Sequence, residues 1–116
     1  MVDVAACVLG VEEGRAIALL SSKLGALVCE GENTDSFRIY AAGAVTVVVI
    51  PNEGVLEIWV HHSRMWPSSP VFARFLAAGL GCTARCDPGA EAPDIDPCSD
   101  ALLEIDGEGE RIVTLS

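Results

Sequence analysis

The order of secondary-structure patterns occurs twice along this chain, and that order restricts the fold more than any single motif. Each half begins with an apolar strand, continues with a helix that ends in Leu-Gly, and closes with three further strands. The helix ends are Leu24-Gly25 and Leu80-Gly81, where glycine supplies the left-handed residue that terminates a helix. We therefore predict an α+β protein of two pseudo-repeated β-α-β-β-β halves, residues 1–51 and 55–116, with two helices packed on a largely antiparallel sheet.

Hydrophobic periodicity assigns the individual elements. Apolar residues at helical spacing, such as Leu20 and Leu24, mark the core-facing stripe of the first helix. In the second helix we expect Ser69 as the N-cap and Pro70 at the first helical position. The strand patterns cover residues 3–9, 26–30, 37–41, 44–50, 55–62, 82–87, 101–106 and 111–115. With 116 residues, the chain fits one domain over residues 1–116.

The strand at residues 55–62 alternates clearly between two faces. Apolar side chains and His62 share one face, so His62 is expected in the core, while acidic, aromatic and basic groups share the other. If a neighbouring strand adds a cation and a second aromatic ring, this second face suits a small-molecule pocket. The candidate ligand residues are Arg38, Tyr40, Glu57, Trp59 and His61. An ordinary solvent-facing sheet surface is the alternative.

The charge distribution is strongly acidic. Seventeen acids face seven bases, giving a net charge of −10, and nine of the acids lie between Asp87 and Glu110 with no Lys or Arg among them. Such a surface repels phosphate backbones, so we expect no nucleic-acid partner. It attracts a basic protein, and a proline-stiffened loop presents part of it. The predicted partner-binding residues are Asp94, Asp96, Asp100 and Glu104. A solvated surface that only maintains solubility is the alternative.

Motifs for catalysis, cofactors or metals are missing from the sequence. There is no P-loop, dinucleotide fingerprint or serine-nucleophile motif. The five cysteines have irregular spacing and no CxxC pair, so we expect reduced, mostly buried thiols and neither a disulfide framework nor a zinc site. We therefore predict no catalytic residue, cofactor or metal ligand, and an enzyme is the less favoured class. No apolar stretch reaches the ~18 residues of a membrane span, and a cytoplasmic location is expected.

The paired modules, with helix ends Leu20-Ser-Ser-Lys-Leu-Gly25 and Leu76-Ala-Ala-Gly-Leu-Gly81, resemble the vicinal oxygen chelate superfamily. That superfamily includes glyoxalases, extradiol dioxygenases and bleomycin-resistance proteins. The resemblance covers the whole chain through its element order. Metal-dependent members carry His or Glu near the start of each module's first strand and Glu on its last strand. Here the first strands offer Asp3 and Glu57, and the last strands carry no acid. The resemblance thus implies a metal-free small-molecule-binding protein or a degenerate enzyme.

Three functional hypotheses remain open from the sequence. The first is a small acidic protein-binding module of the bacterial immunity-protein type, which engages a basic partner. The second is the metal-free small-molecule binder or degenerate enzyme of the paired-module kind. The third is a structural homodimer. Fold analogy alone does not choose among them, because function depends on the site.

Overall fold

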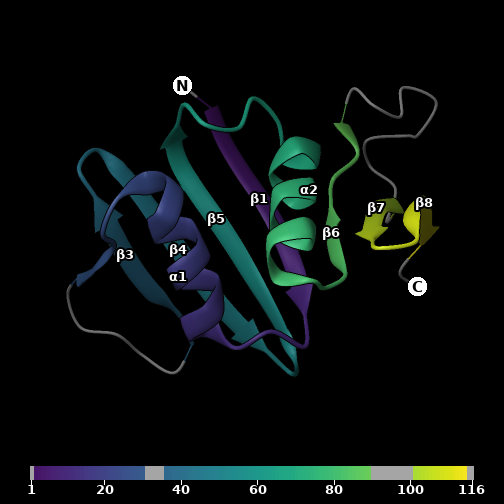
Figure 1. Ribbon diagram of the computed structural model, residues 1–116, viewed down its shortest axis with the longest axis horizontal. Helices are drawn as coiled ribbons and strands as arrows, with labels where there is room; N and C mark the ends of the chain where they lie inside the picture. Colours follow the sequence, from purple (N-terminus) through teal and green to yellow (C-terminus); the bar gives the residue numbers. More distant parts are fainter. Residues whose placement is uncertain (1, 31–35, 90–100, 115–116) are drawn as a thin grey trace.

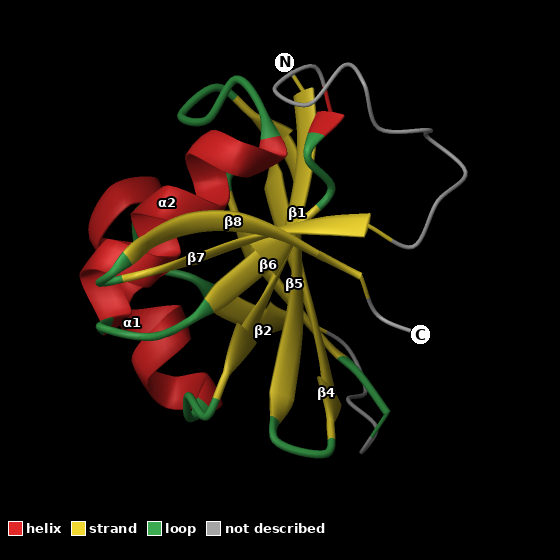
Figure 2. Ribbon diagram, turned by 90° about the vertical axis from the view of Figure 1, so that its right-hand side faces the viewer, coloured by secondary structure: helices red, strands yellow, loops and turns green. Residues whose placement is uncertain are grey.

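Two helices lie on the same face of an eight-stranded antiparallel sheet (Figure 1). This computed structural model describes residues 2–30, 36–89 and 101–114, and the counts refer to those residues. Figure 2 views the molecule from the side and shows both helices packed to one side of the strands. The predicted α+β class, with two helices on antiparallel sheet, is confirmed.

The predicted order of elements, β-α-β-β-β twice, is also confirmed. In chain order the elements are β1 (Val2–Leu9), α1 (Glu13–Leu24), β2 (Val28–Glu30), β3 (Arg38–Ala42), β4 (Val45–Asn52), β5 (Val55–Ser63), α2 (Ser69–Leu80), β6 (Ala84–Cys86), β7 (Ala101–Asp106) and β8 (Gly109–Thr114). Within the described residues, neither helix is long and apolar enough to cross a membrane.

The repeat holds along the chain but not in the pairing of strands. The strand order across the sheet is β2-β3-β4-β5-β1-β6-β7-β8. The first strand of the second half, β5, pairs with β4, the last strand of the first half. The first strand of the first half, β1, pairs instead with β6, which directly follows the second helix. The two halves are therefore joined through the central β1–β5 pair without matching each other in space.

The core lies between the helices and the inner face of the sheet. Alternate residues of the central strands point inward, as their period of two requires, and Val4, Val8, Ile58 and Val60 are almost completely buried. Leu20 from α1 and Phe72 and Leu76 from α2 cover them, and all three are fully buried. The helices approach each other closely at Gly79, where an added Cβ would lie 2.6 Å from the Leu19 side chain.

A β-bulge ends the alternation of β5. Opposite Asp3 on β1, two residues of β5 stand in place of one, and His62 adopts a left-handed φ of 63°. His62 is consequently exposed, and Ser63 takes the buried place, where its Oγ accepts hydrogen bonds from the N–H groups of Met65 and Trp66. The expectation that His62 belongs to the core is wrong, because alternation along a strand does not continue through a bulge.

Helix α2 begins one residue earlier than expected. Ser68 is the N-cap and accepts a hydrogen bond from the Val71 N–H at 3.4 Å. Ser69 is instead the first helical residue, and its Oγ accepts the Ala5 N–H of β1 at 3.0 Å. The predicted cap at Ser69 was thus wrong by one position. Because Ser68 caps the helix, the Ser69 hydroxyl is available to bind β1 and to fasten the start of the helix to the sheet.

Two phenylalanines in α2 provide a matched test of this core. Both pack against the Trp66 ring, with centroid distances of 4.8 Å for Phe72 and 5.0 Å for Phe75. Phe72 is fully buried and Phe75 only partly. Phe72→Ala should therefore lower the free energy of unfolding by ~3–5 kcal/mol, and Phe75→Ala by markedly less. Urea unfolding followed by circular dichroism measures both, and equal losses would contradict the assignment of the buried face.

Candidate functional site

The five candidate ligand residues do not share one face. Trp59 pairs with Val48 of β4, which pairs with Ile39 of β3, so these three side chains lie on the face opposite the helices. Arg38 and Tyr40 alternate with Ile39 and therefore lie on the helix-covered face. The expectation that all five form one face is wrong for these two residues, because the register between β3 and β5 is not visible in the sequence. Glu57, Trp59 and His61 remain together, as predicted.

Arg38 and Tyr40 meet a residue of α1. Both donate to the carboxylate of Glu13 in the first turn of the helix, Arg38 to one oxygen at 2.7 Å and the Tyr40 hydroxyl to the other. Burial raises the pKa of Tyr40 to about 12, and the neighbouring Glu13 carboxylate adds to this increase. Because both carboxylate oxygens are engaged, this cluster fastens α1 to β3 and is not an open ligand site.

Arginines from outside the acidic run neutralise part of it. Glu104 on β7 accepts hydrogen bonds from Arg85 on β6 at 2.8 Å and from Arg111 on β8 at 2.7 Å. These guanidinium groups, Arg111 first, hold the pKa of Glu104 below its usual value. Arg111 also binds Asp106, and Arg74 of α2 binds Glu110. Strand pairing brings these charges together, which a count along the chain does not reveal.

The predicted partner-binding residues therefore separate into two groups. Asp94, Asp96 and Asp100 lie outside the described residues. Glu104 is described, and its carboxylate is committed to two arginines on the neighbouring strands. A partner could use Glu104 only in competition with these arginines, so it is not the free acid that the sequence suggested.

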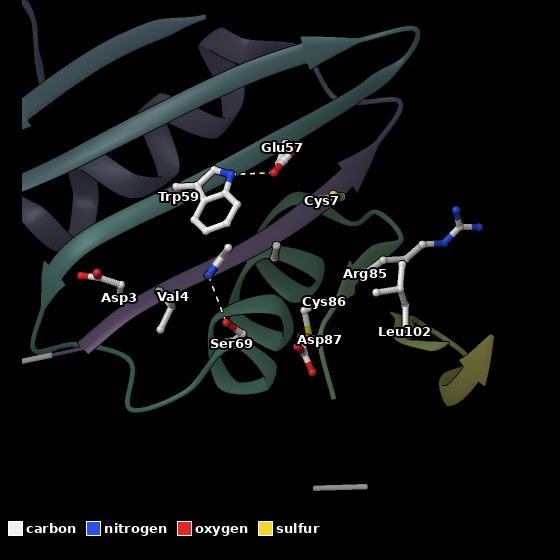
Figure 3. Close-up of a pocket in the computed structure, with 12 residues that line it drawn as sticks. Asp3, Val4, Cys7, Glu57, Trp59, Ser69, Arg85, Cys86, Asp87 and Leu102 are labelled. Atoms are coloured by element: carbon white, nitrogen blue, oxygen red, sulfur yellow. Dashed lines mark hydrogen bonds between the residues drawn. The ribbon is translucent and has the colours of Figure 1, made fainter. Parts of the chain in front are cut away.

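The face of the sheet opposite the helices contains a hollow of about 370 Å³ (Figure 3). It lies beside the first half of β1, which among the described residues has a strand partner on one side only. Along β1, residues pair with β5 from Val2 to Leu9, but with β6 only at Cys7 and Val8. We call this the open-face hollow, and its lining residues are Asp3, Val4, Ala5, Ala6, Cys7, Glu57, Trp59, Ser69, Arg85, Cys86, Asp87 and Leu102.

Local structure explains why the hollow is there. The Ala5 N–H points toward the β6 side of β1, and the Ser69 hydroxyl satisfies it in place of a strand partner (Figure 3). Ala5 is opposite Trp59 in the register of β1 and β5, so a methyl group lies beside an indole. The small side chain and the missing strand pairs together leave the space. This combination of features depends on tertiary contacts. Of the residues that line the hollow, only Glu57 and Trp59 were predicted as ligand residues.

Trp59 and Glu57 form one side of the hollow. The indole Nε1–H donates to a Glu57 carboxylate oxygen at 2.6 Å, and the indole remains 38% exposed (Figure 3). This hydrogen bond fixes the orientation of the ring and uses its polar atom. The exposed part of Trp59 is therefore an aromatic surface with a carboxylate at its edge.

Asp3 and His61 lie together near the bulge. The Asp3 carboxylate accepts the His62 backbone N–H at 3.1 Å and lies 3.4 Å from the His61 Nδ1. The backbone hydrogen bond, followed by that from His61, lowers the pKa of Asp3. Asp3 is therefore ionised at neutral pH. His61 does not line the hollow, but it adjoins it through Asp3.

The Cys7 thiol, which lines the hollow, is a poor nucleophile. Burial raises the pKa of the Cys7 thiol, and the nearby Glu57 charge raises it further. Because thiolate rather than thiol is the reactive form, Cys7 is unsuited to covalent catalysis at neutral pH. The four described cysteines are less buried than predicted: Cys86 is buried, Cys7 and Cys82 are half-buried and Cys29 is exposed. Cys98 lies outside the described residues. Within residues 2–30, 36–89 and 101–114, no group of three potential ligands is placed to hold a metal ion.

No family model, curated protein or solved structure matches the chain. The resemblance to the vicinal oxygen chelate superfamily therefore stays a prediction.

Tyr40 offers a direct test of the Glu13 cluster, because it is the only tyrosine in the chain. In the folded protein its phenol should ionise near pH 12, compared with 10 in the unfolded chain. Since the folded pKa is raised, this group contributes stability below pH 10 that is lost as the pH rises toward 12. Titration of tyrosinate absorbance, with and without urea, measures both values. Glu13→Gln should lower the folded midpoint, and a folded wild-type midpoint near 10 would contradict the contact.

Proposed function

We propose that this protein is a non-catalytic binding module that engages a basic protein partner through the sheet face opposite the helices. The observation that carries the proposal is the open-face hollow, in which the exposed indole of Trp59 lies beside carboxylates. The proposed partner is the one that the acidic sequence predicts, a basic protein. The proposed contact surface is the face that contains Glu57 and Trp59, and not the acidic run around Asp94.

The charge supports a basic partner. A net charge of −10 creates a field that speeds the encounter with a cationic protein. At the hollow itself, Asp3, Glu57 and Asp87 contribute three carboxylates. Among the described residues that line the hollow, Arg85 is the one base, and its guanidinium is bound to Glu104 at 2.8 Å. The hollow therefore presents an excess of negative charge to an approaching molecule.

The distribution of apolar side chains supports a protein interface. Trp59 stands on a central strand. Its cross-strand neighbour Val48 and the next residue along that row, Ile39 on β3, are half-buried on the same face. Aromatic residues at the centre of an apolar patch, surrounded by polar groups, are the usual anchors of binding energy. The sheet face thus offers both an anchor and a charged rim.

The hollow also favours a second candidate, the binding of a small molecule. Its volume of about 370 Å³ lies at the lower end of the roughly 300–1,000 Å³ range for ligand pockets. A homodimer through this face is less favoured, because it would bring together two chains that each carry a charge of −10. Protonated Cys7 argues against a thiol enzyme at this place.

Kinetic measurements on a basic partner, captured from lysate at low salt and then purified, test the proposal. Trp59→Ala should weaken binding by ~2 kcal/mol or more, mainly through faster dissociation, as for an interface anchor. Raising the salt should slow association, because it screens the carboxylates. Glu108→Gln, which removes one exposed acid at the tip of the β7–β8 hairpin, is the matched control and should change little. A partner with no basic surface, or one indifferent to Trp59→Ala, would contradict the proposal.

A further inference from the structure

The open-face hollow has the chemistry of a receptor for one organic cation. One wall is the Trp59 indole, whose N–H is already bound to Glu57 at 2.6 Å. What the ring offers to a ligand is its electron-rich face, which attracts a cation within about 6 Å of the ring centroid. Ala5, opposite Trp59 in the strand register, leaves the approach to this face open.

Acidic residues line the hollow on three separate segments, and Asp3 contributes its charge only, because both of its oxygens are engaged by His62 and His61. Glu57 comes from β5, Asp3 from β1 and Asp87 from the residues that follow β6. The guanidinium of Arg85 extends away from the Trp59 ring (Figure 3), toward the Glu104 carboxylate that binds it. The positive charge among the described lining residues is thus directed away from the Trp59 ring.

These features select among ligand classes. A phosphate or carboxylate would be repelled by the net negative charge of the lining residues. A neutral apolar ligand would remove water from the carboxylates without replacing their hydrogen bonds. A metal ion needs several converging ligands, and none of the described residues form such a group. An organic cation satisfies both the indole and the acids.

Among organic cations, the guanidinium group fits best. It is planar and weakly hydrated, so it stacks on an aromatic face, and its fork of N–H donors can bind a carboxylate at two points. The Trp59 face and the Glu57 carboxylate, held together by their hydrogen bond, present both features side by side. An ammonium group could pair with an acid but could not also stack as a plane.

We infer that the open-face hollow binds a single guanidinium group, carried by an arginine side chain of the partner protein. This inference rests on the proposed function for the source of the arginine. The chemistry of the hollow itself can be tested without any partner, so that the failure of one is distinguishable from the failure of the other.

The test uses methylguanidinium chloride, titrated at millimolar concentrations far below denaturing ones, with sodium chloride at equal ionic strength as the reference. The indole N–H resonance of Trp59 in a ¹⁵N-labelled sample is the reporter, assigned by its loss in Trp59→Phe. The buried Trp66 supplies a second indole signal that reports on folding. We expect a saturable shift of the Trp59 signal with methylguanidinium and none with sodium chloride. The absence of a saturable shift would overturn the inferred guanidinium site.

Two variants of this sample separate the roles of charge and space. Glu57→Gln should raise the dissociation constant about threefold or more, as expected for a partly exposed ion pair. Ala5→Leu changes no charge but fills the hollow, and it should raise the constant about tenfold. Glu108→Gln, on the β7–β8 turn, is the control for net charge and should match the wild type. Equal affinity for methylguanidinium in the wild type and all three variants would show a non-specific ionic effect and would overturn the inferred guanidinium site.

The last comparison identifies the source of the guanidinium. An arginine-containing peptide from the partner's contact region should bind at least about tenfold tighter than methylguanidinium, and its Arg→Gln version should lose this advantage. Equal affinity of peptide and free cation would overturn the assignment to a protein side chain and favour a small-molecule ligand. If the partner binds while methylguanidinium does not, the proposed function stands and the inferred guanidinium site is overturned.

Discussion

The pairing of β1 with β5 is the contact on which the rest of this structure depends. It joins the two halves of the chain at the middle of the sheet, and it places Val4 and Val8 beside Ile58 and Val60 in the core. On one side of the pair stands the β2-β3-β4 meander, and on the other side β6, β7 and β8. Without the central pair, each group of three strands would expose a long unpaired edge and half of a core.

Two irregularities in that central region create the candidate site. The bulge at His61 and His62 turns one histidine out of the core and brings the Asp3 carboxylate to its backbone N–H. The short pairing of β1 with β6 leaves the Ala5 N–H to the Ser69 hydroxyl and opens the hollow beside Trp59. Bulges and interrupted ladders are common beside functional sites, because they redirect side chains that a regular sheet would hold in line.

The acidity of the chain acquires a different meaning once the strands are paired. Several acids of the C-terminal run are internal partners of Arg74, Arg85 and Arg111, and they hold the last strands and α2 together. The acidic residues that line the hollow are distributed over three segments, and two of them lie far from that run in sequence. Local density of charge in a sequence is therefore a poor guide to where a folded protein presents an unbalanced charge.

The sequence by itself determined the elements, the two helices on antiparallel sheet and the shared face of Glu57, Trp59 and His61, because all of these follow from local periodicity. It could not place Arg38 and Tyr40, since a shift of one residue in the register between strands exchanges the two faces. Nor could it place His62, Ser69 or the hollow. Tertiary structure decided these, because each depends on which backbone groups find strand partners and which must find a side chain instead.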